Sequence, residues 1–247
     1  MIARNTYMRI SGAFALLSLV ISASTLASPS HSILTKQDGR IISSCKSDLD
    51  ADGIVETVVI TARTQKDRHP MGGDVVVMQT VGGKLKPVWR QEKLNPWKLQ
   101  IADVDDDGKC EIVVGVWKKS PKDPVMAKRT FVYSWDGRRM LPKWLGSRLS
   151  RRFDDFALCD INRDGWDELL ALEICANGKH RVSAYRWQVF GFDWLGCSSE
   201  VSGLQGLDFA NGRPVVRAYG YKMDVKYSAG KIILNRKKGD AKSVKHH

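Results

Sequence analysis

The sequence predicts an all-β protein, a β-propeller-like array of about four blades built from four-stranded repeats of ~55 residues. Three observations support this fold class. An acidic loop recurs three times, starting at Asp48, Asp103 and Asp160, at intervals of about 55 residues. A run of β-branched and aliphatic residues follows each loop. Apolar residues do not keep a helical period of 3.6 for three turns anywhere after the N-terminus.

The N-terminus has the pattern of a secretory signal peptide over residues 1–27. Arg4 and Arg9 precede a short apolar stretch at 13–21, and the small residues of Thr25-Leu26-Ala27 suit cleavage after Ala27. The apolar stretch is shorter than a typical membrane-spanning helix, although an uncleaved anchor is the alternative interpretation. We therefore expect a secreted or periplasmic protein with no transmembrane span after signal removal.

Residues 28–235 form the predicted repeat domain, and each repeat contains several strand signals. The runs that follow the acidic loops are 57–60, 112–116 and 169–172, and the next runs are 74–80, 130–135 and 181–187. Gly82-Gly83 and Asp136-Gly137 are hairpin signals. Strands at 99–102 and 156–159 lead into the second and third loops.

Several residues outside the loops recur in register, which makes a chance repeat improbable. Five residues of the first repeat return about 55 positions later: Val77, Gly82, Pro87, Trp89 and Leu94 correspond to Val132, Gly137, Pro142, Trp144 and Leu149. Tyr133-Ser134-Trp135 corresponds to Tyr185-Arg186-Trp187. A fourth, diverged copy covers 207–216 and 227–234.

The loops follow the pattern D-x-D-x-D-G-x-x-E, which places oxygen ligands on one side of a tight turn. Glycine at the sixth position permits the sharp backbone reversal, and hard oxygen donors favour Ca²⁺ over zinc or copper. The predicted ligands are the side chains at positions one, three, five and nine and the carbonyl at position seven. They are Asp48, Asp50, Asp52, Ile54 and Glu56; Asp103, Asp105, Asp107, Lys109 and Glu111; and Asp160, Asn162, Asp164, Trp166 and Glu168.

These assignments predict about three Ca²⁺ sites and none in the fourth copy. A helical calcium loop would need Glu at position twelve, where Val59, Val114 and Ala171 stand instead. Aligned on Gly212, the fourth copy has lost its acids. Asp106 and Asp167 are out of phase with the ligands and are expected to face water.

The loops resemble the FG-GAP (VCBS-type) repeats of integrin-α-like β-propellers. The resemblance covers residues 40–235 and implies that the loops join strands of one blade and bind Ca²⁺ structurally. Integrin-type propellers have seven blades, whereas this chain has room for about four. Residues 33–44 could supply a strand that completes the last blade, or the rim could pair with another chain.

No recognisable catalytic constellation is present, so we expect a non-enzymatic protein. His69 and His180 lie near turns, without a nucleophile motif such as G-x-S-x-G. The recurring tryptophans, Trp89, Trp135, Trp144 and Trp187, are expected to pack between blades. Among the five cysteines, Cys175 could pair with Cys159 or Cys197, or all could be free thiols.

The formal charge of +12 favours an anionic partner. Because the acids concentrate in the loops, the rest of the surface and a basic, disordered tail at 236–247 carry the positive charge. Export makes nucleic acid a poor partner. We therefore expect a calcium-binding adhesion, scaffold or lectin-like module for a protein, an anionic glycan or another cell-envelope component. The alternative is a secreted, polysaccharide lyase-like carbohydrate-active enzyme on a calcium-bearing propeller.

Overall fold

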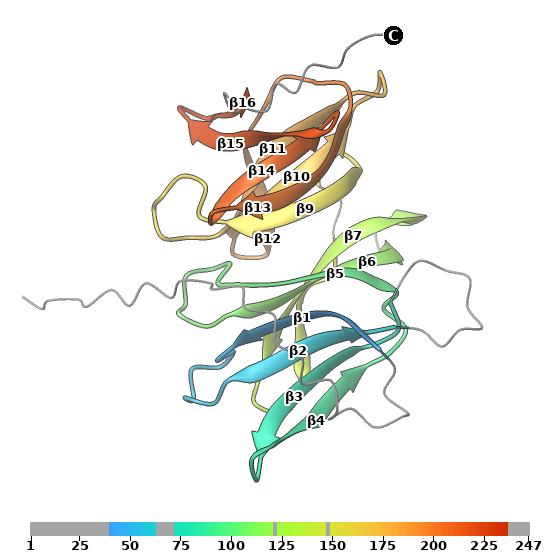
Figure 1. Ribbon diagram of the computed structural model, residues 1–247, viewed down its shortest axis with the longest axis vertical. Coiled ribbons are helices and arrows are strands. Elements are labelled where there is room, and N and C mark those ends of the chain that lie inside the picture. The colour runs from blue at the N-terminus through green and yellow to red at the C-terminus, as the bar shows by residue number, and fades with distance from the viewer. Residues whose placement is uncertain (1–39, 63–71, 121–122, 147–148, 237–247) are drawn as a thin grey trace, which may run out of the picture.

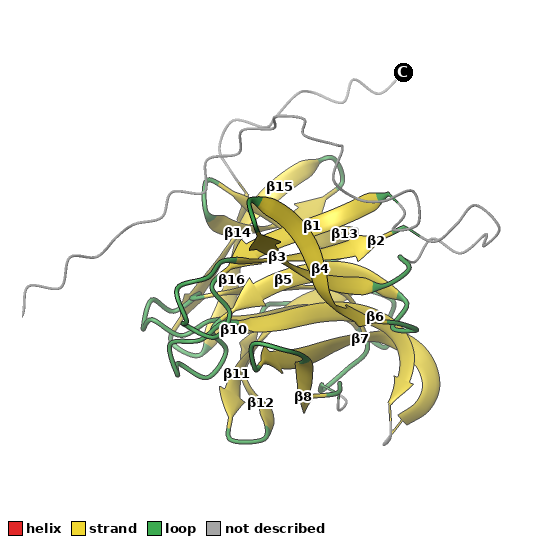
Figure 2. Ribbon diagram, turned by 90° about the horizontal axis from the view of Figure 1, so that it is seen from below, coloured by secondary structure: helices red, strands yellow, loops and turns green. Residues whose placement is uncertain are grey.

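The computed structural model describes residues 40–62, 72–120, 123–146 and 149–236. The signal peptide predicted at 1–27, His69 and nearly all of the predicted tail lie outside these ranges. Every regular element in the described part of the chain is a β-strand, as Figure 2 shows. These ranges contain no helix long and apolar enough to cross a membrane.

The strands form four antiparallel sheets of four strands each, in chain order. The first sheet holds β1 (Ile41–Ser47), β2 (Glu56–Thr61), β3 (Val75–Val81) and β4 (Lys84–Gln91). The second holds β5 (Pro96–Ala102), β6 (Glu111–Ser120), β7 (Asp123–Trp135) and β8 (Met140–Trp144). The third holds β9 (Phe153–Cys159), β10 (Glu168–Ile174), β11 (His180–Gln188) and β12 (Gly191–Cys197). The fourth holds β13 (Leu204–Ala210), β14 (Arg213–Ala218), β15 (Tyr221–Ser228) and β16 (Lys231–Arg236).

This arrangement confirms the all-β class and the four four-stranded units. It excludes one alternative for the described part of residues 33–44: β1 pairs with β2 in the first sheet, so residues 41–44 do not complete the last blade. Arg236, where the sequence placed the start of the tail, is the last residue of β16.

Successive sheets pack on one another along the long axis of the molecule, from β1–β4 at the lower end of Figure 1 to β13–β16 at the upper end. The first strands make part of these contacts, because β5 contacts both β1 and β9, and β9 contacts β13. A hydrophobic core lies between each pair of successive sheets. We call them the first, second and third cores.

The second strands of the middle sheets supply two cores at once. In β6, Ile112 and Val114 face the first core while Val113 faces the second. In β10, Leu169 faces the second core and Leu170 the third. Neighbouring side chains on a strand point to opposite faces, so burial of both faces requires a continuous apolar run. This explains the continuous apolar runs that follow the second and third loops, at 112–116 and 169–172.

The recurring tryptophans pack as predicted. Trp135, Trp144 and Trp187 are buried, and the half-buried Trp89 packs against the first core. Trp194, which lies outside this register, is 55% exposed. All five cysteines are free thiols, the second of the two alternatives that the sequence left open.

Candidate metal centre

The three acidic loops connect the first and second strands of the first three sheets, β1–β2, β5–β6 and β9–β10. They project from the same edge of the array, at the left of Figure 1. Each loop reverses through two residues with left-handed backbone, at the fourth and sixth positions. The sixth is glycine in every loop, as expected, whereas Ala51, Asp106 and Arg163 hold the fourth with φ between 58° and 67°. The sequence did not signal this second strained position.

The aspartate at position one stabilises the turn by accepting backbone hydrogen bonds. Asp48 accepts from the amides of Asp52 (3.1 Å) and Gly53 (2.9 Å). Asp103 accepts from Gly108 (2.9 Å), and Asp160 accepts from Asp164 (3.0 Å) and Gly165 (2.9 Å). These bonds consume amides that would otherwise be unpaired in a tight turn. The loops are therefore held in shape by their own acidic side chains.

The glutamate at position nine begins the second strand of each of the first three sheets and is buried in all three loops. One oxygen of Glu56 accepts the amide of Leu49 at 3.0 Å. Glu111 and Glu168 accept the equivalent amides, of Val104 at 3.1 Å and Ile161 at 3.2 Å. The second oxygen of each glutamate accepts a hydrogen bond from a side chain on another strand of its sheet.

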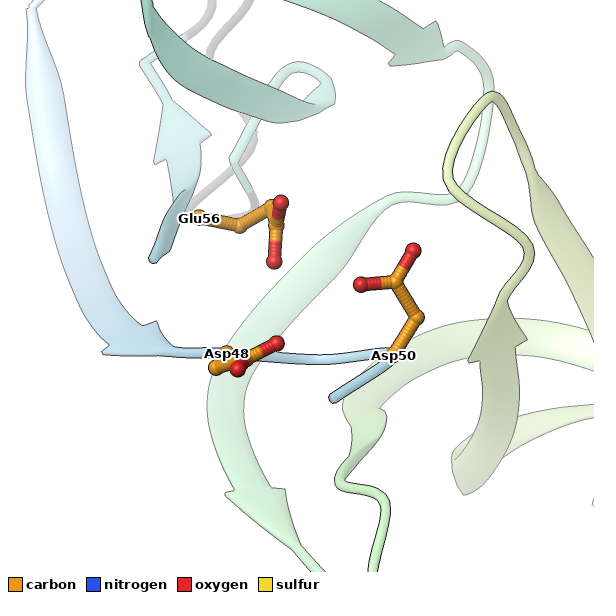
Figure 3. Close-up of side chains that lie close together, drawn as sticks. All are labelled: Asp48, Asp50 and Glu56. Carbon is orange, nitrogen blue, oxygen red and sulfur yellow. The ribbon is translucent and has the colours of Figure 1, made fainter. Parts of the chain in front are cut away.

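In each loop, carboxylates converge closely enough to hold a metal ion. Their ligand oxygens lie within 4.8 Å of one another in three sets: Asp48, Asp50 and Glu56; Asp103, Asp105 and Glu111; Asp160, Asp164 and Glu168. Figure 3 shows the carboxylates of the first set facing a common space. Because Ca²⁺ binds oxygen at 2.3–2.6 Å, two ligands on opposite sides of one ion would be separated by about this distance.

Buried carboxylate oxygens without a hydrogen-bond partner occur in the first two loops: Oδ1 of Asp50 in the first, and Oδ1 of Asp103 and of Asp105 in the second. The turn between β7 and β8 lies against the carboxylate of Asp50, since a Cβ added to Gly137 would lie 3.1 Å from its other oxygen, Oδ2. Burial, followed by the negative charge of Asp52 and Asp48, raises the pKa of Asp50. A divalent cation would satisfy Oδ1 of Asp50 and remove the repulsion.

Two predicted ligands have another role in the structure. Asp52 and Asp107, at position five, are exposed and accept the amides of Ile54 (2.7 Å) and Lys109 (2.9 Å). In the third loop Asp164 at the same position belongs to the converging set, and Asn162 donates to Asp164 and to Glu168, both at 3.1 Å. The carbonyls of Ile54, Lys109 and Trp166 remain predicted ligands.

Asp167 was expected to face water because it is out of phase with the ligands, but the structure differs. It is half-buried, and burial together with the charges of Asp160 and Asp103 raises its pKa to about 6. It therefore lies between the second and third loops, where it adds a further carboxylate. Asp106 is exposed, as expected.

Three side chains that the sequence analysis missed reach the second oxygen of the buried glutamates. Gln79 of β3 donates to Glu56 at 2.8 Å. Lys143 of β8 lies 2.6 Å from both Glu111 and Asp105. Arg186 of β11 donates to Glu168 at 2.7 Å and also pairs with Asp164. The register of the repeat could have identified two of these side chains, Gln79 and Arg186, because they occupy the same position of the repeat, where the second repeat has Ser134.

The fourth unit has no comparable loop. Asn211 and Gly212 form a tight turn between β13 and β14, with φ of 52° and 69°. A hairpin of this kind suits Asn-Gly and leaves no room for a five-ligand loop. Among the described residues no acidic cluster is found at this turn.

A separate polar cavity of about 580 Å³ lies where the second, third and fourth sheets meet. Its lining includes Trp97, Lys98 and Lys128 of the second sheet and Asp154 and Asp155 of the third. Lys98 pairs with Asp155 at 2.8 Å, and His180 contacts Asp154 at 2.8 Å. His180 is thus a partner of a carboxylate.

No protein-family model and no curated protein matches this chain. Among solved structures, the chain is similar to one described as the structure of a Xanthomonas Type IV secretion system related protein. That protein is 13% identical, and the match covers 78% of this chain and 98% of the other with a TM-score of 0.32. A likeness this distant carries no argument about function.

Proposed function

We propose that this protein is an exported, calcium-stabilised, non-enzymatic module of the FG-GAP type, in which a propeller-like array presents loops to a protein or an anionic glycan. The convergence of Asp48, Asp50 and Glu56 within 4.8 Å, with one oxygen of Asp50 buried and unpaired, is the observation that carries the proposal. The site offers only oxygen ligands, which suits Ca²⁺.

The role of Ca²⁺ in this proposal is to fix the loops at one edge of the array. In the absence of metal, the buried carboxylates repel one another, and binding removes that repulsion only in the folded state. At a calcium concentration one hundred times the dissociation constant, one site adds about 2.7 kcal/mol to the free energy of unfolding. Thermal unfolding with Ca²⁺ and with EGTA tests this effect. Identical melting temperatures would exclude a calcium-binding role.

The proposed anionic partner is inferred from the basic side chains that are exposed at the surface. Part of the basic set is structural: Arg129 is buried, pairs with Asp123 at 2.9 Å and donates to the carbonyls of Lys118 and Val125. Arg138 and Arg152 remain exposed and available to an acidic partner, whereas the exposed Arg139 pairs with Asp136 at 3.3 Å. Binding to an array of sulfated and uronic-acid glycans, weakened by salt, would support the glycan partner. Recovery of one envelope protein in a crosslinked pull-down would support a protein partner instead.

The second candidate, a secreted carbohydrate-active enzyme, is favoured only by the polar cavity between the second, third and fourth sheets. That cavity combines an aromatic ring, lysines and paired aspartates, which a charged sugar could contact. Turnover of acidic polysaccharides that is lost in Asp154→Asn would support the enzyme. Glycan binding without turnover would favour the non-enzymatic module.

A further inference from the structure

The three acidic loops differ in the charge of the side chain that reaches their buried glutamate. In the first loop the donor is Gln79, which is neutral and makes one hydrogen bond, to Glu56. In the second and third loops the donors are cations, and each bridges the glutamate to an aspartate of the converging set. Lys143 joins Glu111 to Asp105, and Arg186 joins Glu168 to Asp164. Each cation thus contacts two of the carboxylates that a metal ion would need, although Oδ1 of Asp103 and of Asp105 in the second loop have no hydrogen-bond partner.

The register of the sheets explains why a lysine reaches the second loop and not the first. Val77 pairs with Trp89 and Met78 with Pro87, with a bulge between the two pairs. The equivalent pairs in the second sheet are Val132 with Trp144 and Tyr133 with Pro142, around the same bulge. Val88 and Lys143 are therefore the bulged residues at equivalent positions. Ser134 takes the place of Gln79, which leaves space for the lysine.

We propose that Lys143 and Arg186 are tethered cations that take the place of a metal ion in the second and third loops, so that the first loop is the principal Ca²⁺ site. This inference rests on the proposed calcium-binding function and assigns it to one of three loops. A metal ion entering the second or third loop would have to displace an ammonium or guanidinium group that is already paired. It would otherwise lie close to that group and be repelled by it. Unpaired carboxylate oxygens do not distinguish the first two loops, because both have them. The charge does: an ion in the first loop would meet the neutral amide of Gln79, and an ion in the second would meet the ammonium group of Lys143.

Calorimetric titration with CaCl₂ is the first test. The wild-type chain should bind one Ca²⁺ at least about tenfold more tightly than any other, a difference of about 1.4 kcal/mol or more. Lys143→Met, which keeps the aliphatic stem and removes the charge, should tighten binding at the second loop by about tenfold. Lys86→Met, at an exposed lysine of β4, is the matched control and should leave every site unchanged.

The converse variant places a lysine at the equivalent position beside the first loop. The double substitution Gln79→Ser and Val88→Lys reproduces the residues of the second sheet and should weaken the tight site by about tenfold or more. Gln79→Ser with Val88→Met, which lacks the charge, is its control and should keep the tight site. Loss of that site in both double variants would overturn the inference, because charge would then not be the cause.

A measurement without calcium separates failure of this inference from failure of the proposed function. In EGTA, Lys143→Met should lower the melting temperature, because Glu111 and Asp105 lose their cation, whereas Lys86→Met should not. Three equal calcium sites in the wild-type chain, unchanged by Lys143→Met, would overturn the inference and leave calcium binding standing. Destabilisation of Lys143→Met in EGTA, with no calcium bound by any variant, would refute the proposed function and restrict the lysine to a structural ion pair.

Discussion

The packing of the fourth sheet on the third makes a sharp prediction at Gly196. This residue of β12 lies against the turn that joins β15 to β16. A Cβ added to Gly196 would lie 2.1 Å from the carbonyl oxygen of Gly230 and 2.8 Å from its carbonyl carbon. Both neighbours are backbone atoms, so no side-chain rotation can relieve the contact. The two sheets would have to separate locally by about 1 Å to restore a normal van der Waals distance.

Gly196→Ala should therefore destabilise the protein even though it adds only a methyl group. Overpacking of a well-filled interface costs about 1–3 kcal/mol, and a rigid backbone contact belongs at the upper end. Replacing glycine lowers the entropy of the unfolded chain and returns about 0.4–1 kcal/mol. The net loss in the free energy of unfolding is about 2 kcal/mol. For a chain of this size this corresponds to a melting temperature lower by about 4–8 °C.

Thermal unfolding in EGTA, followed by circular dichroism, measures this loss without a contribution from metal binding. Gly191→Ala is the matched control on the same strand, because its added Cβ would lie an ordinary 3.4 Å from Nε1 of Trp144. It should change the free energy of unfolding by less than about 0.5 kcal/mol. Equal melting temperatures for the two variants would refute the packing of β12 on the β15–β16 turn.

Three further predictions concern the core and the loops. Leu170→Ala should lower the free energy of unfolding by about 2–5 kcal/mol in a denaturant titration, because Leu170 is fully buried in the third core. Ile233→Ala, at a 43% exposed position, should lower it by less than about 1 kcal/mol. Equal losses for the two variants would contradict the assigned core. Asp50→Asn should abolish most of the calcium-induced rise in melting temperature without lowering the melting temperature in EGTA, since it also removes repulsion with Asp48 and Asp52; an undiminished calcium effect would exclude Asp50 as a ligand. The pKa of Asp167 is raised to about 6, so the folded state binds the proton more tightly than the unfolded state. In EGTA, the free energy of unfolding of the wild-type chain should therefore fall relative to that of Asp167→Asn as the pH rises from about 4 to 6, by on the order of 2 kcal/mol. Parallel plots of the free energy of unfolding against pH for the two chains would contradict this prediction.

The sequence was sufficient for the features that depend on local pattern. The apolar runs after the acidic loops predicted strands at 57–60, 112–116 and 169–172, and each lies within an observed second strand. Glycine at the sixth loop position predicted the turn, because only a left-handed backbone closes it. The carboxylates at positions one and nine were predicted to converge, and they do.

The features that the sequence did not reveal depend on contacts between strands. Lys143 lies more than thirty residues from Glu111 along the chain, and only the bulge in the β7–β8 ladder directs it toward the second loop. Asp167 was expected in water because its phase within the loop is wrong for a ligand. It is half-buried, and the charge of Asp103 in the second loop acts on it, which no pattern within one loop can indicate.

The two-sided burial of the second strands separates the parts of the repeat that can change from those that cannot. A substitution in a loop affects one turn, and the fourth unit has exchanged its entire acidic loop for the two residues Asn211 and Gly212 while keeping its four strands. A substitution in β6 or β10 alters two cores at once, since adjacent residues such as Leu169 and Leu170 belong to different ones. After duplication, the loops of the individual repeats can therefore diverge independently. The second strands of the middle sheets must keep apolar residues, because a neighbouring sheet packs on each of their faces.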